Sequence, residues 1–432
     1  MARLGAFCFA GTGHINPMTA LAFRLQERGH EVILFGIRDI EARVRAAGIG
    51  FCPIGESDYP PGALETLDRV LAQKKGLATF RFTVDRVRNT ARMVLRDGPD
   101  AVRRSNIDAL LVDEADMGGS VAEYLDLPFV SIAFFPPLMK GDRIPPFCFG
   151  WKAGQGRLSR LRNRLGMRFL SRVAAPIYTE VNAQRSRWGL KPLKHAADAL
   201  SALAQITQLP AALEFEVGPP SPLLYYTGPF VNASRRPPVD FPWDRLDGRP
   251  LLYASLGTLQ NGAEEIFRKI AQACVGLDVQ LVISLGGGLD PASLGKLRGK
   301  PLVVRYAPQL EIVKRAAAVI THAGLNTTLE SLAEGVPLVC LPLGNDQPGV
   351  AARVAAHGAG IVISRRRLTA KRLRSAIIAV LHQAKYRAAA RRLGIAIRRI
   401  DGLAQAADII ETALKIESPR RDTIATTVAG SP

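Results

Sequence analysis

The sequence predicts an α/β fold in which two Rossmann-like domains, each built on a parallel sheet, face each other across a cleft. Short apolar runs alternate with longer amphipathic ones, which is the pattern of repeated βαβ units. The chain has 432 residues, 47% of them apolar, and this is more than a single hydrophobic core usually supports. Two domains are therefore expected, with ligands at the carboxyl ends of the strands.

A proline-rich stretch, residues 228–250, divides the chain. Proline lacks an N–H and fixes φ, so this stretch is predicted to be a linker between an N-terminal domain, 1–227, and a C-terminal domain, 251–416. Strands are expected at residues 4–10, 31–35, 109–112, 129–134, 251–255, 280–284, 302–306, 318–321, 338–341 and 360–363. We expect the last helices to pack back on the first domain and residues 417–432 to form a flexible tail.

Charge and cysteine content narrow the class of protein. The 57 basic and 38 acidic side chains give a net charge of +19, which favours phosphate-bearing partners without specifying which kind. The five scattered cysteines suggest neither a disulfide framework nor a zinc site and fit a reducing cytoplasm. The N-terminal apolar run is too short for a signal peptide, and no run of about 18 apolar residues indicates a membrane span.

His14 is the first candidate catalytic residue. It follows the first strand and a glycine turn, and a helix is expected to begin at Asn16 with Pro17 at its first position. The positive end of the helix dipole should keep the imidazole neutral near pH 7, as a general base requires. The alternative is a histidine that merely packs in the loop or caps the helix.

Asp113 is expected at the carboxyl end of a neighbouring strand, facing the same cleft. A carboxylate bonded to one ring nitrogen fixes the histidine tautomer and stabilises the imidazolium, with the hydroxyl of a substrate in the place of a catalytic serine. Asp113 can equally cap the helix that follows it, and the local sequence leaves both roles open.

A second site is indicated in the C-terminal half, where a strand ends near Thr321 and a helix begins near Asn326. Free N–H groups and the helix dipole suit a diphosphate there, and His322 can add a donor. The turn Ser255, Gly257 and Thr258 can hold the other side of the diphosphate. Glu330 is placed to accept hydrogen bonds from ribose, and Tyr306 offers a ring for a base to stack on.

These segments resemble the donor-binding signature of the UDP-glycosyltransferases of the GT-B fold. The match runs from Tyr306 to Gln347, including His-Ala-Gly-Leu-Asn-Thr and Asp-Gln-Pro-Gly, and the turn Gly-Thr-Gly-His-Ile-Asn-Pro supports it. The pattern is similar to the bacterial branch that contains zeaxanthin glucosyltransferases. Many plant members have tryptophan at the position of Tyr306 and Cys-Gly-Trp at the positions of Ala323, Gly324 and Leu325.

The resemblance implies a base at His14 with Asp113 as its partner, and a donor site on the C-terminal domain. Phosphate is assigned to His322, Asn326 and Thr327, ribose to Glu330, and sugar hydroxyls to Asp346 and Gln347. The expected donor-binding residues are Ser255, Gly257, Thr258, Tyr306, Ala307, Gln309, His322, Gly324, Asn326, Thr327, Glu330, Asp346 and Gln347.

The expected reaction is an inverting, metal-independent transfer of a hexose, with glucose as the first candidate, from a UDP-sugar to a hydroxyl of a lipophilic acceptor. UDP-sugar is a co-substrate, and no cofactor or metal is expected. A hydroxycarotenoid such as zeaxanthin is the first acceptor candidate, with a flavonoid, macrolide or sterol as alternatives. The acceptor pocket is expected in the N-terminal domain, on loops such as residues 57–79 and 136–151.

Residues 140–172 are basic and interleaved with apolar side chains. Such a segment can lie on an anionic membrane surface, and a bilayer-dwelling acceptor favours this interpretation. The alternative is a solvated helix whose apolar stripe joins the core.

Three other functions are alternatives to the transferase. Asp113-Glu-Ala-Asp116 is a helicase-type motif, but the phosphate loop G-x-x-x-x-G-K is absent, so no nucleic-acid partner is expected. The turn at Gly11 and Gly13 lacks the third glycine of a nicotinamide site. A non-catalytic nucleotide-sugar binder or an epimerase is separated from a transferase only by the pair His14 and Asp113.

Overall fold

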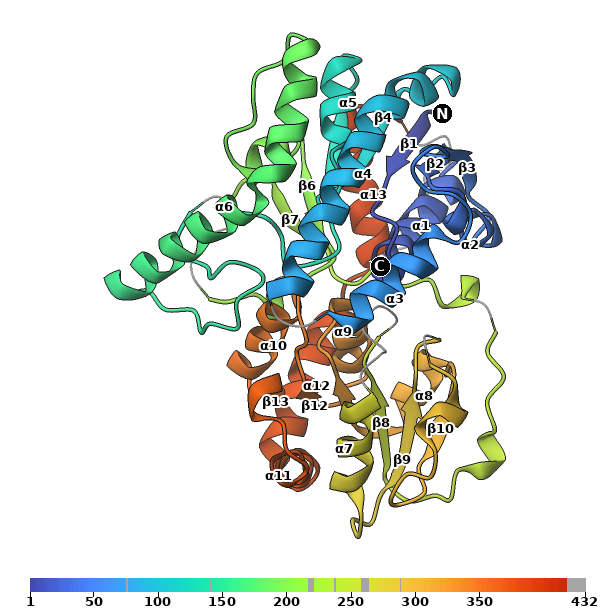
Figure 1. Cartoon of the computed structure of the whole chain (residues 1–432), viewed down its shortest axis with the longest axis vertical. Helices are drawn as coiled ribbons and strands as arrows, with labels where there is room; N and C mark the ends of the chain where they lie inside the picture. Colours follow the sequence, from blue (N-terminus) through green and yellow to red (C-terminus); the bar gives the residue numbers. More distant parts are fainter. Residues whose placement is uncertain are drawn as a thin grey trace, which may run out of the picture.

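Two parallel sheets form the cores of two domains that lie one above the other in Figure 1. The computed structural model describes residues 1–74, 77–139, 141–216, 221–236, 238–257, 264–287 and 289–417. The flexible tail proposed for residues 417–432 lies, apart from residue 417, outside the described residues. The α/β class with two Rossmann-like domains is confirmed.

The first sheet has seven strands in the order β3-β2-β1-β4-β5-β6-β7, and the second has six in the order β10-β9-β8-β11-β12-β13. All the pairings are parallel. The strands of the first sheet are β1 (Arg3–Phe7), β2 (Glu31–Gly36), β3 (Gly50–Pro53), β4 (Ala109–Asp113), β5 (Phe129–Ala133), β6 (Gln205–Thr207) and β7 (Leu224–Tyr226). Those of the second are β8 (Leu251–Ser255), β9 (Gln280–Ser284), β10 (Leu302–Val304), β11 (Ala316–Thr321), β12 (Leu338–Cys340) and β13 (Gly360–Val362).

Each of the ten predicted strands is present, with ends that shift by a few residues. The three strands that were not predicted, β3, β6 and β7, have only four, three and three residues. Between β7 and β8, the described part of the proline-rich stretch contains two short 3-10 turns, Ala233–Arg235 and Trp243–Arg245.

The helices cover the faces of both sheets. In the first domain they are α1 (Thr12–Glu27), α2 (Glu41–Ala46), α3 (Ala63–Gln73), α4 (Leu77–Arg104), α5 (Gly118–Tyr124) and α6 (Arg157–Arg187). After the linker come α7 (Glu264–Cys274), α8 (Gln309–Arg315), α9 (Leu325–Ala333), α10 (Gln347–Ala356), α11 (Ala370–His382), α12 (Ala384–Arg398) and α13 (Gly402–Leu414).

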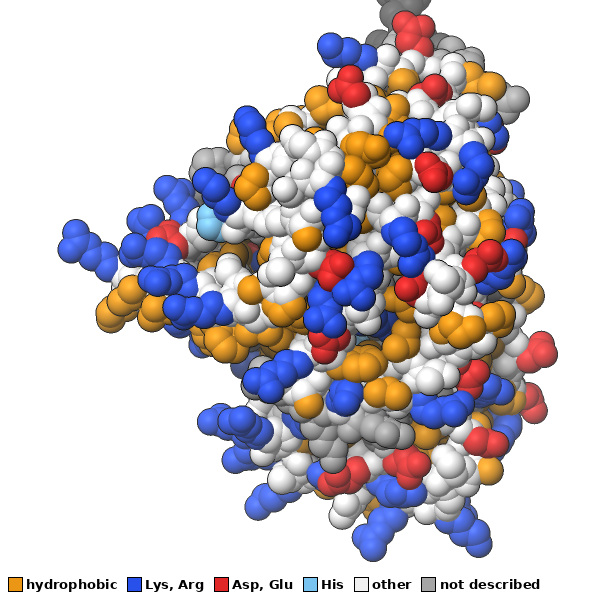
Figure 2. All heavy atoms as spheres, turned by 45° about the horizontal axis from the view of Figure 1, so that its top comes forward, with side chains coloured by type: hydrophobic (Ala, Val, Ile, Leu, Met, Phe, Trp, Pro, Cys, Tyr) orange, Lys and Arg blue, Asp and Glu red, His pale blue; other side chains and the backbone are white. Residues whose placement is uncertain are grey.

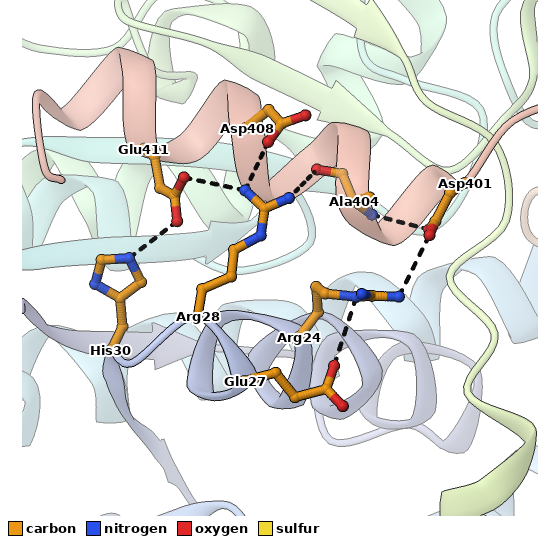
Figure 3. Close-up of polar contacts among 8 residues, drawn as sticks. All are labelled: Arg24, Glu27, Arg28, His30, Asp401, Ala404, Asp408 and Glu411. Carbon is orange, nitrogen blue, oxygen red and sulfur yellow. Dashed lines mark hydrogen bonds and ion pairs between the residues drawn. The ribbon is translucent and has the colours of Figure 1, made fainter. Parts of the chain in front are cut away.

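Helix α13 returns to the first domain and packs against α1 (Figures 1 and 3). Its apolar side, including Leu403 and Ile410, belongs to the core of that domain. Arg28 donates to Asp408 at 2.6 Å and to Glu411 at 3.0 Å, and Glu411 also bonds the buried His30 at 3.1 Å. These contacts fasten the end of the second domain to the first sheet.

The strand order places a switch point in each sheet, where successive strands turn to opposite sides. It lies between β1 and β4 in the first sheet and between β8 and β11 in the second, and in both cases the two strands are paired neighbours. Loops that leave these strand ends form a crevice, which is the usual ligand site of open parallel sheets. The candidate catalytic and phosphate-binding residues lie on these four strand ends.

Candidate active site

His14 and Asp113 form a hydrogen-bonded pair at the first switch point. The His14 Nδ1 lies 2.6 Å from Asp113 Oδ2, and the Asp113 side chain is fully buried. Asp113 also accepts the backbone N–H groups of Phe9 at 3.2 Å and Ala115 at 2.9 Å. These bonds fix the carboxylate, so the histidine carries its proton on Nδ1 and presents Nε2 as the free nitrogen.

Asp113 does not cap the helix that follows it. Helix α5 begins only at Gly118, and the N–H of Gly118 is bonded by Asp116. Of the two roles that the sequence left open for Asp113, the structure shows the contact with His14.

Two expectations about His14 were wrong. Helix α1 begins at Thr12, not at Asn16, so His14 is the third helical residue and Pro17 lies inside the helix. The pKa of His14 is also raised rather than held down: burial lowers it most, but the charge and the hydrogen bond of Asp113 together outweigh burial. The adjacent carboxylate of Asp113 therefore decides the direction of the shift.

Pro17 has a consequence for the contact between the domains. A proline has no N–H, so the carbonyl of Gly13, four residues earlier, lacks its usual helical donor. Asn326 of α9 donates its Nδ2 to this carbonyl at 3.0 Å. Gln208, after β6, donates to Asn326 Oδ1 at 2.7 Å and to the Phe134 carbonyl at 3.3 Å. The first turn of α1, which carries His14, is thus bonded directly to the start of α9.

The start of α9 has the groups that could hold an anion. Gly324 is its N-cap residue, and the first N–H groups of the helix have no intrahelical partner. The His322 ring lies against Gly257 and Gly324, where a Cβ would approach it to 2.7 and 2.5 Å. Burial lowers the pKa of His322 to about 4, opposed only by a hydrogen bond with the Ser255 backbone, so this ring is neutral at pH 7.

Glu330, expected to bind ribose, is buried and already bonded. It pairs with Arg236 of the linker, and it accepts from Gln309 Nε2 at 2.6 Å. Gln309 in turn lies 3.3 Å from the Thr327 hydroxyl. Tyr306, which follows β10, is half-exposed and lines the same cleft.

The remaining predicted donor residues line the same cleft. These are Ser255, Gly257, Ala307, Asp346 and Gln347. Gln347 accepts the N–H groups of Leu343 at 2.8 Å and Gly344 at 3.1 Å, which holds the loop before α10. Burial raises the pKa of Asp346 to about 6, against its own backbone hydrogen bond and the charge of His14. Thr258 lies outside the described residues.

One cleft of about 1840 Å³ runs between the two domains and contains both groups. His14 lines it from the first domain, and His322, Gly324 and Asn326 line it from the second. The part within the first domain is lined by apolar residues such as Phe80, Val84, Phe134, Phe135, Phe147 and Met167, and also by charged side chains such as Glu114, Arg164 and Arg168. Residues 137–139 and 141–147 contribute to it as expected, but residues 57–74 do not, because the wall on that side comes from α4.

Three further residues of the site were missed by the sequence reasoning: Arg236 and Glu114, which line the cleft, and Gln208, which bonds Asn326. Burial raises the pKa of Glu114 to about 8, and its Oε1 is a buried oxygen without a hydrogen-bond partner. The carboxyl therefore faces the acceptor side in a form that can donate a proton. No motif marks Gln208 or Arg236, whereas Glu114 stands beside Asp113 in a run that was tested only against helicases.

The part of the chain that the structure describes contains no group of three or more histidine, cysteine, aspartate or glutamate side chains arranged to hold a metal ion.

Comparison with known proteins identifies the family. The chain is 30% identical over 94% of its length to a zeaxanthin glucosyltransferase of Pantoea ananas, of which it covers 94%. The chain belongs to the UDP-glycosyltransferase family. Residues 202–399 of this UDP-glycosyltransferase match the family model for UDP-glucoronosyl and UDP-glucosyl transferase, and residues 6–136 match that of the glycosyltransferase family 28 N-terminal domain.

Further relatives agree with this assignment. The glycosyltransferase is 32% identical to a zeaxanthin glucosyltransferase of Pseudescherichia vulneris, over 82% of this chain and 84% of the relative. Its fold is similar to the glycosyltransferase of kitacinnamycin, with a TM-score of 0.74, 21% identity and coverage of 95% of this chain and 98% of that structure. The expectation of a UDP-dependent glycosyltransferase with a GT-B fold is confirmed, and this separates it from the binder and epimerase alternatives.

The basic segment 140–172 forms the loop before α6 and the first half of α6. Lys140 lies outside the described residues. The apolar stripe on the first half of α6 does not join the core, because Leu158, Leu161, Leu165 and Phe169 are all exposed. Among the described helices, none has the length and apolarity needed to cross a membrane.

Proposed function

We propose that this glycosyltransferase moves a hexose, with glucose as the first candidate, from a UDP-sugar to a hydroxyl of a lipophilic acceptor, with inversion at the anomeric carbon. The observation that carries the proposal is the single cleft shared by the pair His14–Asp113 and the start of α9. A hydroxycarotenoid is the first acceptor candidate, supported by the names of two relatives and by the apolar wall of the cleft.

In this mechanism the acceptor hydroxyl lies against His14 Nε2. As its oxygen forms a bond to the anomeric carbon, its proton passes to Nε2, and the bond between that carbon and the UDP oxygen breaks on the opposite face. Asp113 holds the Nδ1 proton and stabilises the imidazolium. The charge that grows on UDP is taken up by the first N–H groups of α9 and by His322. We propose that no metal takes part.

The donor would occupy the C-terminal domain and the acceptor the N-terminal domain. Tyr306 would stack on uracil with Ala307 at its edge, Ser255, Gly257 and Thr327 would flank the diphosphate, and Asp346 with Gln347 would bind sugar hydroxyls. For Glu330 to bind ribose, Arg236 must release at least one carboxylate oxygen. We also propose the cytoplasm as the place of action, which the five free cysteines support.

The test is mass spectrometry of the products after incubation with UDP-glucose and a mixture of hydroxycarotenoids, flavonoids, sterols and macrolides. The proposal predicts a hexose adduct on a hydroxycarotenoid. An adduct on another aglycone would replace the acceptor, and turnover only with a different nucleotide sugar would replace the donor.

Replacing Asp113 by asparagine should move the pH profile and lower its plateau. His14 accepts a proton only when neutral, so kcat/KM falls as the pH drops through its folded pKa, which Asp113 raises. Without that charge the pKa falls, and the acidic limb should move to lower pH while the maximal rate declines. An unchanged limb in a pH series of kcat/KM would mean that another group is titrating.

The Asn326→Asp substitution should weaken both donor binding and turnover. It is isosteric, but a carboxylate cannot donate to the Gly13 carbonyl, and its charge would face the diphosphate at the start of α9. We expect at least about tenfold weaker UDP binding in calorimetry, from one lost donor and one repulsive charge. Wild-type affinity in this variant would show that the bond between Asn326 and Gly13 and the anion site are not coupled.

A further inference from the structure

The first half of α6 projects from the first domain as an arm, at the left of Figure 1. The second half of α6 packs on α4, whereas the stretch from Arg157 to Phe169 stands away from both sheets. This arm and the loop before it also line the acceptor part of the cleft, through residues such as Pro146, Arg164 and Met167.

The arm exposes an apolar stripe. Leu158 is 83% exposed, Leu161 48%, Leu165 56% and Phe169 46%. These residues are three or four positions apart, so their side chains lie on one face of the helix. The ring of Phe169 contacts that of Phe149, with 6.4 Å between their centroids. Phe149 is in turn stacked on Trp151, with 4.2 Å between the ring centroids. A contiguous apolar surface of this kind on a folded protein marks an interaction site.

The charges beside the stripe are almost all positive. Residues 141–172 contain eight arginine and lysine residues and one acidic residue, Asp142. Asp142 bonds Arg160 at 2.8 Å and Arg164 at 3.2 Å. Arg157, Arg168 and Arg172 have no ion-pair partner among the residues that the structure describes. Figure 2 shows basic and apolar side chains gathered together on the projecting arm.

The arm is held in a fixed position, so its stripe is presented at a defined place. Trp151 packs on Gly166, where a Cβ would meet the indole at 2.7 Å, and Arg162 lies over the same indole at 4.9 Å. The buried Asn163 donates to the Asp142 carbonyl at 2.9 Å. The preceding loop reaches the second domain, because Phe147 and Gly150 lie against Gly349 and Pro348 at the start of α10.

We propose that this arm docks on the surface of an anionic lipid bilayer, with Leu158, Leu161, Leu165 and Phe169 in the headgroup layer and the arginines on lipid phosphates. An amphipathic helix with a basic flank and exposed leucine and phenylalanine has the composition that binds such surfaces. The docked arm opens the apolar cleft toward the bilayer, so that a lipophilic acceptor enters without crossing water. This delivery step rests on the proposed function, whereas the docking itself does not.

A second copy of the chain is the other occupant that an apolar stripe could attract. Two such arms would bring their arginines together without acidic partners, because Asp142 is already bonded to two of them. Anionic lipid supplies the missing negative charge, so the observations favour the bilayer.

The test is co-sedimentation of the full chain with vesicles of equal parts phosphatidylcholine and phosphatidylglycerol, against vesicles of phosphatidylcholine alone. We expect binding to the anionic vesicles to exceed binding to the neutral ones by about tenfold or more. It should weaken as salt rises, because the screening length shrinks from about 10 Å at 0.1 M to about 3 Å at 1 M.

Two variants test which side chains of the arm contact the vesicle. Leu158→Ser/Leu161→Ser/Leu165→Ser should lose vesicle binding, and Arg157→Gln/Arg168→Gln should reduce it on anionic vesicles alone. The control Val275→Ser/Ile378→Ser removes apolar side chains that are 42% and 37% exposed on the second domain, and it should bind as the wild type does.

Binding of the triple-serine variant equal to that of the wild type would overturn the proposal. So would light scattering that shows a wild-type dimer lost in that variant, since it would identify a second copy as the occupant. Sedimentation needs neither donor nor acceptor, so an enzyme inactive on every carotenoid would still reveal whether the arm docks.

Discussion

The His14→Ala variant is expected to lose about a hundredfold or more of kcat while it binds UDP as the wild type does. The imidazole is the group in the cleft that is paired with a buried carboxylate on one nitrogen and open on the other. Alanine removes the proton acceptor but leaves the start of α9 and His322 in place. The kinetic change should therefore appear in kcat, with UDP affinity from calorimetry nearly unchanged.

The His382→Ala variant serves as the control, because this histidine is exposed at the end of α11, away from the cleft. It should have wild-type kinetics. If His14→Ala retained full turnover, the proton would have to leave the acceptor by another route, and Glu114, whose pKa is raised to about 8, would be the next residue to replace.

The Arg353→Ala substitution should cost about 3–5 kcal/mol of stability. Arg353 and Glu214 are both buried, and their side chains meet at 2.8 to 3.1 Å where the segment after β6 crosses to α10. Glu214 also accepts from Tyr226 at 3.4 Å, and the guanidinium lies over Phe215 at 4.6 Å. Removing the arginine leaves a carboxylate buried without its counter-charge between the two domains.

Denaturant unfolding measures this cost, and the double variant Glu214→Gln/Arg353→Met should recover much of it because no charge remains uncompensated. The control is Arg69→Ala, whose partner Glu65 and own side chain are 78% and 69% exposed, and it should change stability by about 0–1 kcal/mol. An equally small effect at Arg353 would show that the pair does not hold the domains together.

The fold and the backbone of the site could be predicted because they depend on local patterns. His14 and Asp113 each follow an apolar run, and the parallel order of the strands brings β1 beside β4. The same holds for Ser255 and His322 at the ends of β8 and β11. The glycines that form the turns at these strand ends can be recognised directly in the sequence.

What could not be predicted depends on contacts between distant segments. Gln208 and Arg236 lie outside any motif, and their roles exist only because Asn326 and Glu330 lie opposite them. The start of α1 was predicted too late because proline favours the first position of a helix. Pro17 instead occupies the sixth position, which is tolerated because the Gly13 carbonyl accepts a hydrogen bond from Asn326. The direction of the His14 pKa shift could not be predicted without knowing that Asp113 lies 2.6 Å from the ring.

The central claim is that one acceptor oxygen can lie between His14 and a sugar held at the start of α9. A crystal structure of the enzyme with UDP and an acceptor tests it directly. The account predicts the diphosphate on the N–H groups from Leu325 to Thr327 and the acceptor hydroxyl about 3 Å from His14 Nε2. A complex in which UDP binds there while the reactive hydroxyl is bonded to a different side chain, with His14 turned away from the cleft, would contradict it.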